Sequence, residues 1–156
     1  MPARPQRSAG IICFKPDKRV TGGRLYLLLD YGRFWDYPKG HVEKHEDDLT
    51  AALRELKEET GISDAQVISG FHHEFQYFFR DKLQGLIRKS VIFFLAQTQS
   101  RTITLSHEHS GGEFLPYPQA LKRVTYKNAK ETLTKAHEFL DTTSASPSPG
   151  TQGEAG

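Results

Sequence analysis

The sequence has little of what marks a secreted or membrane-bound protein. Only one of its 156 residues is a cysteine, Cys13, so the chain cannot form an internal disulfide framework. No apolar run approaches the ~18 residues that a membrane-spanning helix needs. Arginines occur near the N-terminus, but no apolar stretch follows them as it does in a secretory signal. These absences favour a soluble protein of a reducing compartment, and we expect it in the cytoplasm, away from membranes.

The sequence also lacks a large excess of one sign of charge, because the formal net charge is only +2. A surface for duplex nucleic acid usually needs a larger excess of Lys and Arg, so we expect no such partner. The length suits one hydrophobic core, which we place in a single domain over residues 8–141, after a flexible N-terminus over 1–7. Residues 142–156 are rich in Ser, Pro and Gly and contain no aromatic or large aliphatic side chain, so we expect a disordered tail.

Short apolar runs predict the strands of this domain. Rich in β-branched and aromatic residues and bounded by turn residues, they lie at residues 9–14, 24–30, 71–79, 89–97 and, more briefly, 112–117. Cys13 falls in the first of these strands, where a buried structural thiol is expected rather than a nucleophile.

Two segments show the periodicity of amphipathic helices. Apolar residues recur at helical spacing at Leu49, Ala52, Leu53 and Leu56, and again, after Pro118, at Ala129, Leu133, Ala136 and Leu140. Strands and helices of this kind in alternation indicate an α/β protein.

The first helix ends in an unusual way. The segment RELKEETG places Glu55, Glu58 and Glu59 just before Gly61, which is the residue type that commonly ends a helix. Carboxylates there add to the negative end of the helix dipole and repel one another, by roughly 0.2–0.5 kcal/mol per neighbouring pair. A solvated helix face would be the simplest explanation, but a bound divalent cation would explain the crowding directly, because Mg²⁺ prefers carboxylate oxygens and phosphates as ligands.

A longer pattern surrounds these glutamates. The segment GHVEKHEDDLTAALRELKEETGI fits G-x5-E-x7-R-E-U-x-E-E-x-G-U, where U is aliphatic, at Gly40, Glu46, Arg54, Glu55, Leu56, Glu58, Glu59, Gly61 and Ile62. With nine specified positions matched, the sequence resembles the Nudix hydrolases. The resemblance implies an α/β/α sandwich with a central mixed sheet, and hydrolysis of a pyrophosphate bond.

The resemblance also implies roles for the matched residues. Glu58 and Glu59 correspond to the principal Mg²⁺ ligands, for which Mn²⁺ is a substitute, and Glu55 to a further ligand or the base that deprotonates water. The carbonyl group of Gly40 is expected to complete the shell. Arg54 and Glu46 look like a supporting pair that holds the loop against the helix.

Segments outside the motif resemble the Nudix branch that cleaves diadenosine tetraphosphate asymmetrically, to ATP and AMP. This resemblance rests on the segments WDYPKGHVE, FQYFF, RKSVIFFLA, LSHEHS and TYKNAKETL. It implies that Lys39, His41 and Lys89 contact phosphates and that Tyr77 and Tyr126 hold an adenine ring. For each of these residues, a solvated or core-packing role is the alternative.

LSHEHS is open to two interpretations. Its two histidines, His107 and His109, suggest a zinc pair, but the third and fourth ligands of a recognisable zinc site are missing. The resemblance instead points to Glu108 as an additional metal ligand or base, with a solvated loop glutamate as the alternative.

The segment before Lys39 departs from the animal members of this branch. It reads Phe34, Trp35, Asp36, Tyr37, Pro38, where the animal pattern is His-Trp-Thr-Pro-Pro, so a histidine near the phosphates is absent. Diphosphoinositol polyphosphates and the 5′-triphosphate end of RNA therefore remain alternative substrates. A sensor that binds a nucleotide without cleaving it is an alternative of another class, although its expected signature, loss of motif carboxylates, is not present. The oligomeric state stays open.

Overall fold

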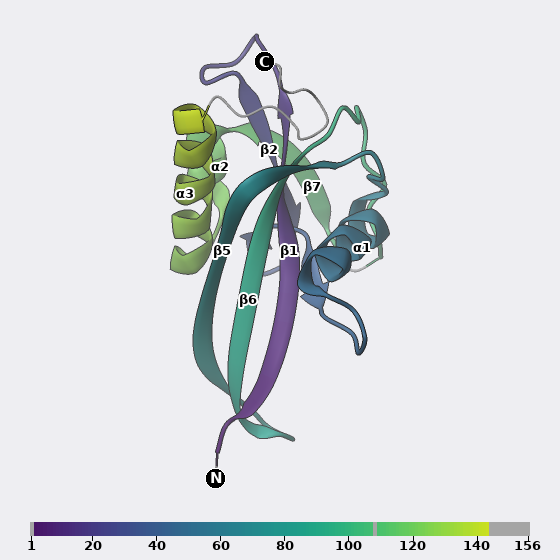
Figure 1. Ribbon diagram of the computed structural model, residues 1–156, viewed down its shortest axis with the longest axis vertical. Helices are drawn as coiled ribbons and strands as arrows, with labels where there is room; N and C mark the ends of the chain where they lie inside the picture. The colour runs from purple at the N-terminus through teal and green to yellow at the C-terminus, as the bar shows by residue number, and fades with distance from the viewer. Residues whose placement is uncertain (1, 108, 144–156) are drawn as a thin grey trace.

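A central β-sheet lies between helices in the computed structural model, which describes residues 2–107 and 109–143 (Figure 1). The elements along the chain are β1 (Arg4–Pro16), β2 (Arg24–Asp30), β3 (Trp35–Asp36), β4 (Lys39–His41), α1 (Asp48–Thr60), β5 (Gln66–Asp81), β6 (Gly85–Gln97), β7 (Gly111–Pro116), α2 (Tyr117–Arg123) and α3 (Lys127–Thr143). Helix α1 lies on one side of the sheet, and α2 and α3 lie on the other. This arrangement is the α/β/α sandwich with a mixed sheet that the sequence predicted.

Strand β1 is the centre of the sheet. Its strand order is β3-β2-β1-β6-β5, while β4 also pairs with β1 and β7 with β2. The β1–β6 pair is parallel over Arg4 to Phe14, and every other pair is antiparallel. β1 is apolar at successive positions because helices cover both of its faces.

Alternate residues of β1 enter different halves of the core. Ile12 and Phe14 pack with the apolar stripe of α3, while Ile11 and Cys13 pack with Ala52 and the rest of the α1 stripe. Both helical stripes expected from the sequence are therefore buried against the sheet. The burial of Cys13 agrees with a structural thiol.

The strands extend further than the apolar runs indicate. β1 begins at Arg4 and pairs with β6 from that residue, so residues 4–7 are strand where a flexible N-terminus was expected. Arg7 explains the difference, since its guanidinium binds Asp48 of α1 and Glu74 of β5, each at 2.7 Å. At the other end, α3 continues to Thr143, two residues into the expected tail; residues 144–156 lie outside the described residues.

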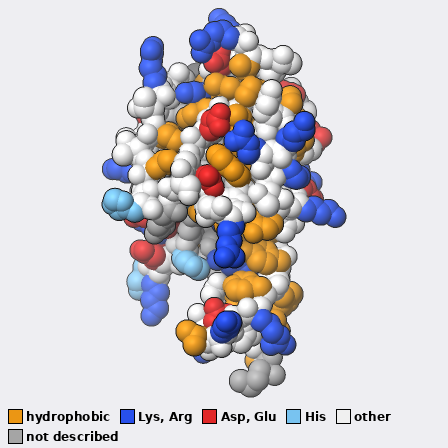
Figure 2. Space-filling view, turned by 180° about the vertical axis from the view of Figure 1, so that it is seen from behind, with side chains coloured by type: hydrophobic (Ala, Val, Ile, Leu, Met, Phe, Trp, Pro, Cys, Tyr) orange, Lys and Arg blue, Asp and Glu red, His pale blue; other side chains and the backbone are white. Residues whose placement is uncertain are grey.

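Strands β5 and β6 form a long hairpin that projects past the helices (Figure 1). They pair up to Asp81 and Gly85, and Asp81 Oδ1 accepts hydrogen bonds from the backbone N–H groups of Leu83 and Gln84. Figure 2, the opposite view, shows hydrophobic side chains running down the lower half of the molecule, with Lys and Arg side chains beside them. Over the described ranges, no helix has the length and apolarity to cross a membrane.

Candidate functional site

The ends of α1 follow from its sequence. Asp47 caps the N-terminus, where its side chain accepts a hydrogen bond from the N–H of Thr50 at 2.8 Å. Gly61 ends the helix in the left-handed conformation, with φ of 77°, which a glycine adopts without strain. Between them, the carboxylate face of α1 points toward β4.

Gly40 allows Glu55 to approach the backbone of β4. A Cβ atom at position 40 would overlap the Glu55 carboxylate, so only glycine leaves room for this contact. β4 is itself held by pairing with β1, with Gly40 opposite Ala9. The glycine and the glutamate of the motif are thus brought together by a direct packing requirement.

Arg54 ties the loop after β4 to the helix, as predicted. Its Nε and Nη2 donate hydrogen bonds to the two oxygens of Glu46, at 2.6 and 3.0 Å. Nη2 also donates to the carbonyl oxygen of His41, and Nη1 lies 3.1 and 3.2 Å from carboxylate oxygens of Glu55 and Glu58. This hydrogen bonding lowers the pKa of Glu46, so that its carboxylate stays ionised.

Glu59 is the most enclosed of the three helical glutamates. Only 6% of the residue is exposed, and its Oε1 lies 3.3 Å from the Tyr31 hydroxyl and 3.8 Å from Nε2 of the fully buried His109 side chain. Burial, followed by the hydrogen bond and the negative charge of Glu55, raises the pKa of Glu59 well above that of an ordinary glutamate. Two carboxylates in contact away from water strongly favour a bound cation or proton.

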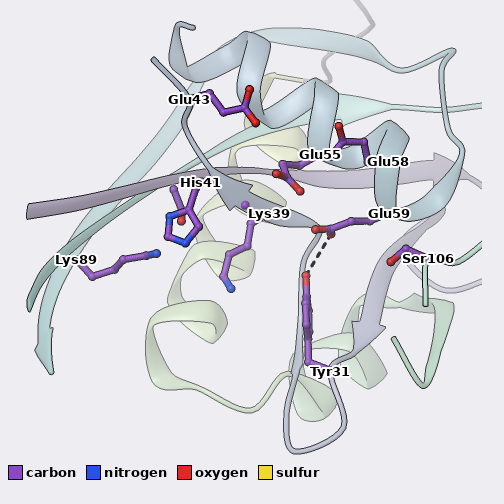
Figure 3. A pocket seen from close by; sticks show the side chains of 11 residues that line it. Tyr31, Lys39, His41, Glu43, Glu55, Glu58, Glu59, Lys89 and Ser106 are labelled. Atoms are coloured by element: carbon purple, nitrogen blue, oxygen red, sulfur yellow. Dashed lines mark hydrogen bonds between the residues drawn. The ribbon is translucent and has the colours of Figure 1, made fainter. Parts of the chain in front are cut away.

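These side chains line one pocket of about 530 Å³ (Figure 3). Its lining residues are Ser8, Tyr31, Lys39, Gly40, His41, Glu43, Glu55, Glu58, Glu59, Lys89 and Ser106. The glutamates come from α1 on one side, and the Lys89 side chain reaches from β6 toward His41 on the other. The structure therefore brings the three predicted carboxylates of α1, Glu55, Glu58 and Glu59, to a single pocket with the predicted phosphate-contacting residues.

The cationic side of this pocket is partly desolvated. Burial, and then the charge of Lys39, lowers the pKa of Lys89 to about 8. Burial also lowers the pKa of His41, with the charge of Lys89 acting in the same direction. Cations held close together away from water favour an anion between them.

The donor set has the chemistry of a divalent cation site. Carboxylate and carbonyl oxygens are hard ligands of the kind Mg²⁺ and Mn²⁺ take, and the contact of Glu55 with Glu59 is unfavourable without a positive charge. Within residues 2–107 and 109–143, no three acidic, histidine or cysteine side chains converge closely enough to hold a metal ion as they stand. Arg54 Nη1 lies 3.1 and 3.2 Å from carboxylate oxygens of Glu55 and Glu58, so its charge partly balances these two carboxylates.

A second pocket, of about 860 Å³, adjoins the first. It is lined by Phe34, Asp36, Lys39, Phe75, Tyr77, Phe79, Val91, Tyr126, Lys127, Asn128 and Ala129. Lys39 lines both pockets, so the first pocket, with its charged side chains, and the second, aromatic pocket meet at the Lys39 side chain. Tyr77 and Tyr126, predicted to hold a base, both face the aromatic compartment.

The sequence did not single out all of the residues that shape the site. Tyr31 and Ser106 line the first pocket, and the ring of His109 lies 4.6 Å from that of Tyr31, between centroids. LSHEHS had drawn attention to His109 as half of a zinc pair, whereas its side chain is buried beside Glu59. The other predicted residue of this segment, Glu108, lies outside the described residues.

Comparison with known families decides the classification. Residues 4–136 match the NUDIX domain family. The chain belongs to the Nudix family. Nudix hydrolases generally use divalent metal ions, which agrees with the donor set of the first pocket.

Relatives of this Nudix protein include asymmetrical bis(5′-nucleosyl)-tetraphosphatases. The enzyme of Mus musculus is 37% identical over 149 residues, covering 89% of this chain and 98% of the relative. The crystal structure of a C. elegans Ap4A hydrolase binary complex superimposes with a TM-score of 0.75 at 29% identity, covering 88% of this chain and 98% of the other. An RNA pyrophosphohydrolase of Bartonella henselae is 35% identical, but over only 53% of this chain and 50% of its own length. The predicted family, fold and branch resemblance are confirmed.

Proposed function

We propose that this Nudix protein hydrolyses diadenosine tetraphosphate asymmetrically, releasing ATP and AMP, with Mg²⁺ as the metal ion and Mn²⁺ as its substitute. The observation that carries the proposal is the pair of adjoining pockets that share Lys39. A nucleoside polyphosphate has the same two parts, an aromatic base and a chain of phosphates. The asymmetrical bis(5′-nucleosyl)-tetraphosphatases among the relatives match this chain over most of its length, which supports the same choice.

The aromatic pocket holds one adenine in this proposal. Tyr77, 40% exposed, and Tyr126, 52% exposed, both line it, and exposed aromatic rings gathered around one pocket are typical of a ligand-binding groove. Stacking of a base on an aromatic side chain contributes about 1–3 kcal/mol. The base would thus anchor the substrate at a distance from the reacting phosphate.

The phosphate chain runs from Lys39 into the first pocket. Lys39, His41 and Lys89 bind its oxygens and orient it toward α1. Glu55, Glu58, Glu59 and the Gly40 carbonyl would hold the metal ion, with Glu108 as a further ligand or base. When bound, the metal ion neutralises phosphate charge and lowers the pKa of water.

We assign removal of the proton from the attacking water to Glu55, with Glu108 as the alternative base. The water oxygen forms a bond to phosphorus, the bridging P–O bond breaks, and the leaving phosphate departs with the bonding electron pair. Arg54 fixes Glu55 for this task through the hydrogen bond from Nη1 at 3.1 Å. Tyr31 and His109 shield Glu59 from water on the opposite side.

Two other substrate classes fit the site less well. Diphosphoinositol polyphosphates carry phosphates around a whole ring, and an RNA adds backbone phosphates beyond its 5′-triphosphate, so a larger group of cations would be expected to meet either substrate. Lys39 and Lys89 are the Lys and Arg side chains among the lining residues of the first pocket. A nucleotide sensor without catalysis would have no need for the complete set of motif carboxylates. We also propose a cytoplasmic location, since the one cysteine is suited to a reducing compartment.

Product analysis tests the proposal. Purified protein with Mg²⁺ is incubated with diadenosine tetraphosphate, a diphosphoinositol polyphosphate and a triphosphorylated RNA in competition, and the products are separated chromatographically. We expect ATP and AMP in equal amounts as the dominant products, and no turnover after removal of divalent ions by a chelator. Dominant turnover of another substrate, or release of two ADP, would contradict the assignment.

A further inference from the structure

The aromatic pocket contains one buried acid that the proposed reaction does not use. Asp36, at the end of β3, lines this pocket with Tyr77 and Tyr126, and it is only 6% exposed. Its charge is felt by Tyr77, whose pKa is raised by burial and then by Asp36. A carboxylate therefore lies at the edge of a compartment that is otherwise suited to a flat aromatic ring.

The carboxylate of Asp36 has accepting capacity left over. Oδ1 accepts a hydrogen bond from the backbone N–H of Tyr37 at 2.8 Å. Oδ2 lies 3.6 Å from Lys39 Nζ, which is longer than the 2.7–2.9 Å of a charge-assisted hydrogen bond. Burial raises the pKa of Asp36, while the charge of Lys39 and the hydrogen bond from Tyr37 act in the opposite direction. An ionised carboxylate has about four acceptor positions, so N–H donors from a ligand would satisfy the positions that remain and favour its charged form.

Asp36 is also fixed relative to Tyr126. The N–H of the preceding residue, Trp35, donates to Thr125 Oγ1 at 2.9 Å, and the N–H of Thr125 donates to the Trp35 carbonyl oxygen at 3.2 Å. Asp36 directly follows Trp35, and Tyr126 directly follows Thr125, so this pair of hydrogen bonds holds the carboxylate and the stacking ring on adjoining segments. A base against Tyr126 would consequently meet the carboxylate in a defined position rather than at the end of a flexible loop.

We propose that Asp36 determines base specificity, by accepting the N–H groups on the edge of the base and so favouring guanine over adenine relative to a pocket without this carboxylate. A carboxylate can only accept hydrogen bonds. The Watson–Crick edge of guanine presents two adjacent donors, N1–H and the 2-amino group, whereas that of adenine presents one amino donor beside an acceptor nitrogen. This inference rests on the proposed function in one respect, that the aromatic pocket is the base site.

The test compares the two bases in one tube. Diadenosine and diguanosine tetraphosphate are mixed with the wild-type protein or with Asp36→Asn, and the rates of ATP and GTP release give the ratio of kcat/KM for guanine over adenine. Asparagine keeps an oxygen for the Tyr37 N–H but puts a donor where guanine needs an acceptor. We expect the ratio to fall about tenfold or more in Asp36→Asn, as for loss of one hydrogen bond to a charged group. Any weakening through Lys39 affects both substrates equally and cancels in the ratio.

A binding measurement separates this inference from the proposed reaction. The affinities of GMP and AMP for wild type and Asp36→Asn are measured by calorimetry, which needs no turnover. Glu113→Gln, an exposed acid paired with Arg123 outside both pockets, is the matched control and should leave the GMP-to-AMP ratio unchanged. An Asp36-dependent ratio without ATP release would support the specificity role while contradicting the proposed reaction. ATP release together with an unchanged GMP-to-AMP affinity ratio in folded Asp36→Asn would support the proposed reaction and contradict the specificity role of Asp36.

A comparison on the wild-type protein keeps the inference testable if Asp36→Asn does not fold. Inosine monophosphate retains N1–H but lacks the 2-amino group, so it removes one of the two donors without a mutation. We expect GMP to bind about tenfold more tightly than inosine monophosphate. Equal affinities would overturn the proposed role of Asp36.

Discussion

At the scale of single residues, the neighbours Glu58 and Glu59 occupy opposite environments. The Glu58 side chain is 57% exposed beside Arg54, whereas that of Glu59 is 8% exposed beneath Tyr31 and His109. Successive helical residues point about 100° apart, so one carboxylate faces solvent and the next faces the core. A metal ion at this helix end would therefore draw one ligand from each environment.

Loss of either carboxylate should abolish most of the turnover. We expect Glu58→Gln and Glu59→Gln each to lower kcat by about 100-fold or more, because metal-ion stabilisation of the transition state is worth several kcal/mol. Circular dichroism should show an intact fold, and Glu59→Gln should melt no earlier than wild type, since it removes the repulsion with Glu55. Glu138→Gln, an exposed acid on α3, is the control. Ordinary metal-dependent turnover in both motif variants would rule out the metal-binding role.

Lys89 makes substrate capture depend on pH. Its pKa of about 8 lies below the 10.5 of an unfolded lysine because of burial and the charge of Lys39. His41 lines the same pocket. The folded state thus disfavours the charged form, and this penalty on stability is present below about pH 8 and fades as pH rises toward 10.5. Anion binding changes in the opposite sense, because neutral Lys89 no longer attracts phosphate.

We accordingly expect kcat/KM to fall as pH rises through about 8, the pKa of Lys89 in the free protein. Lys89→Arg keeps its charge across this range and should remove that fall while retaining activity at neutral pH. Parallel pH profiles of the two proteins, measured with the same substrate and metal concentration, provide the check. An identical alkaline fall in both would assign it to another group.

Residue roles were predictable to the extent that they stand in a fixed pattern along the chain. Glu46 and Arg54 are a clear case, since the family pattern that they match implied a supporting pair, and the structure contains their hydrogen bonds. Tyr31 had no comparable signal, and the sequence patterns around His109 and Asp36 did not indicate their positions in the site. The roles of these residues depend on which distant segments pack beside them. A tyrosine at a strand end and a histidine in a loop are too common to stand out without the fold.

At the scale of elements, β5 presents two different surfaces. Phe75, Tyr77 and Phe79 alternate along the strand and line the aromatic pocket, with Tyr77 and its two neighbours 6.3 and 6.1 Å apart between ring centroids. Phe78, 59% exposed, points to the opposite face. Because of this alternation, Tyr77 is placed to contact the base of the substrate, whereas the adjacent Phe78 is not.

We expect Tyr77→Ala to raise KM by about 5-fold to 150-fold, the range that corresponds to a stacking energy of 1–3 kcal/mol, and to change kcat little. The reacting phosphate is bound in the other pocket, so the chemical step keeps its groups. Phe78→Ala, the adjacent residue on the other face, should leave KM unchanged. Steady-state kinetics with diadenosine tetraphosphate measure both. Equal effects of the two substitutions would indicate a general change in the hairpin instead of a lost base contact.

The elements differed in how well local sequence predicted them. The C-terminal end of α1 was predicted from Gly61, and β2 begins and ends where its apolar run does. β1 was predicted too short because Arg7 and Ser8 are polar, although side chains from α1 and β5 satisfy Arg7. β3 and β4 are two and three residues long and form only through pairing with distant strands, so no local pattern could reveal them.

At the scale of the whole molecule, the parallel pairing of β1 with β6 organises the core. Periodicity does not show which strands are neighbours, and this pair joins segments more than eighty residues apart, for instance Gly10 with Phe93. The mixed sheet was therefore predictable from the family resemblance and not from the apolar runs themselves. The pairing places Cys13 in the interior, between α1 and the sheet.

Cys13 reports on this core because it is the one thiol of the chain. It is fully buried, and burial raises its pKa far above that of an exposed cysteine, which leaves little of the reactive thiolate. We expect an aromatic disulfide reagent to label the native protein very slowly and to label one thiol per chain once denaturant has unfolded it. The urea midpoint of labelling should coincide with the midpoint measured by circular dichroism, since exposure of Cys13 requires the layers to separate.

The control for this experiment carries its thiol on the surface. Leu83, 96% exposed in the hairpin turn, is replaced in the double variant Cys13→Ala, Leu83→Cys, which should react at once without denaturant. Slow reaction of Cys13 beside fast reaction of Leu83→Cys would show that access, not the reagent, limits labelling. Fast labelling of native wild type would mean that the α1 layer opens without global unfolding. The helix that carries the three site glutamates would then separate from the sheet more readily than the shared core of β1 and α1 implies.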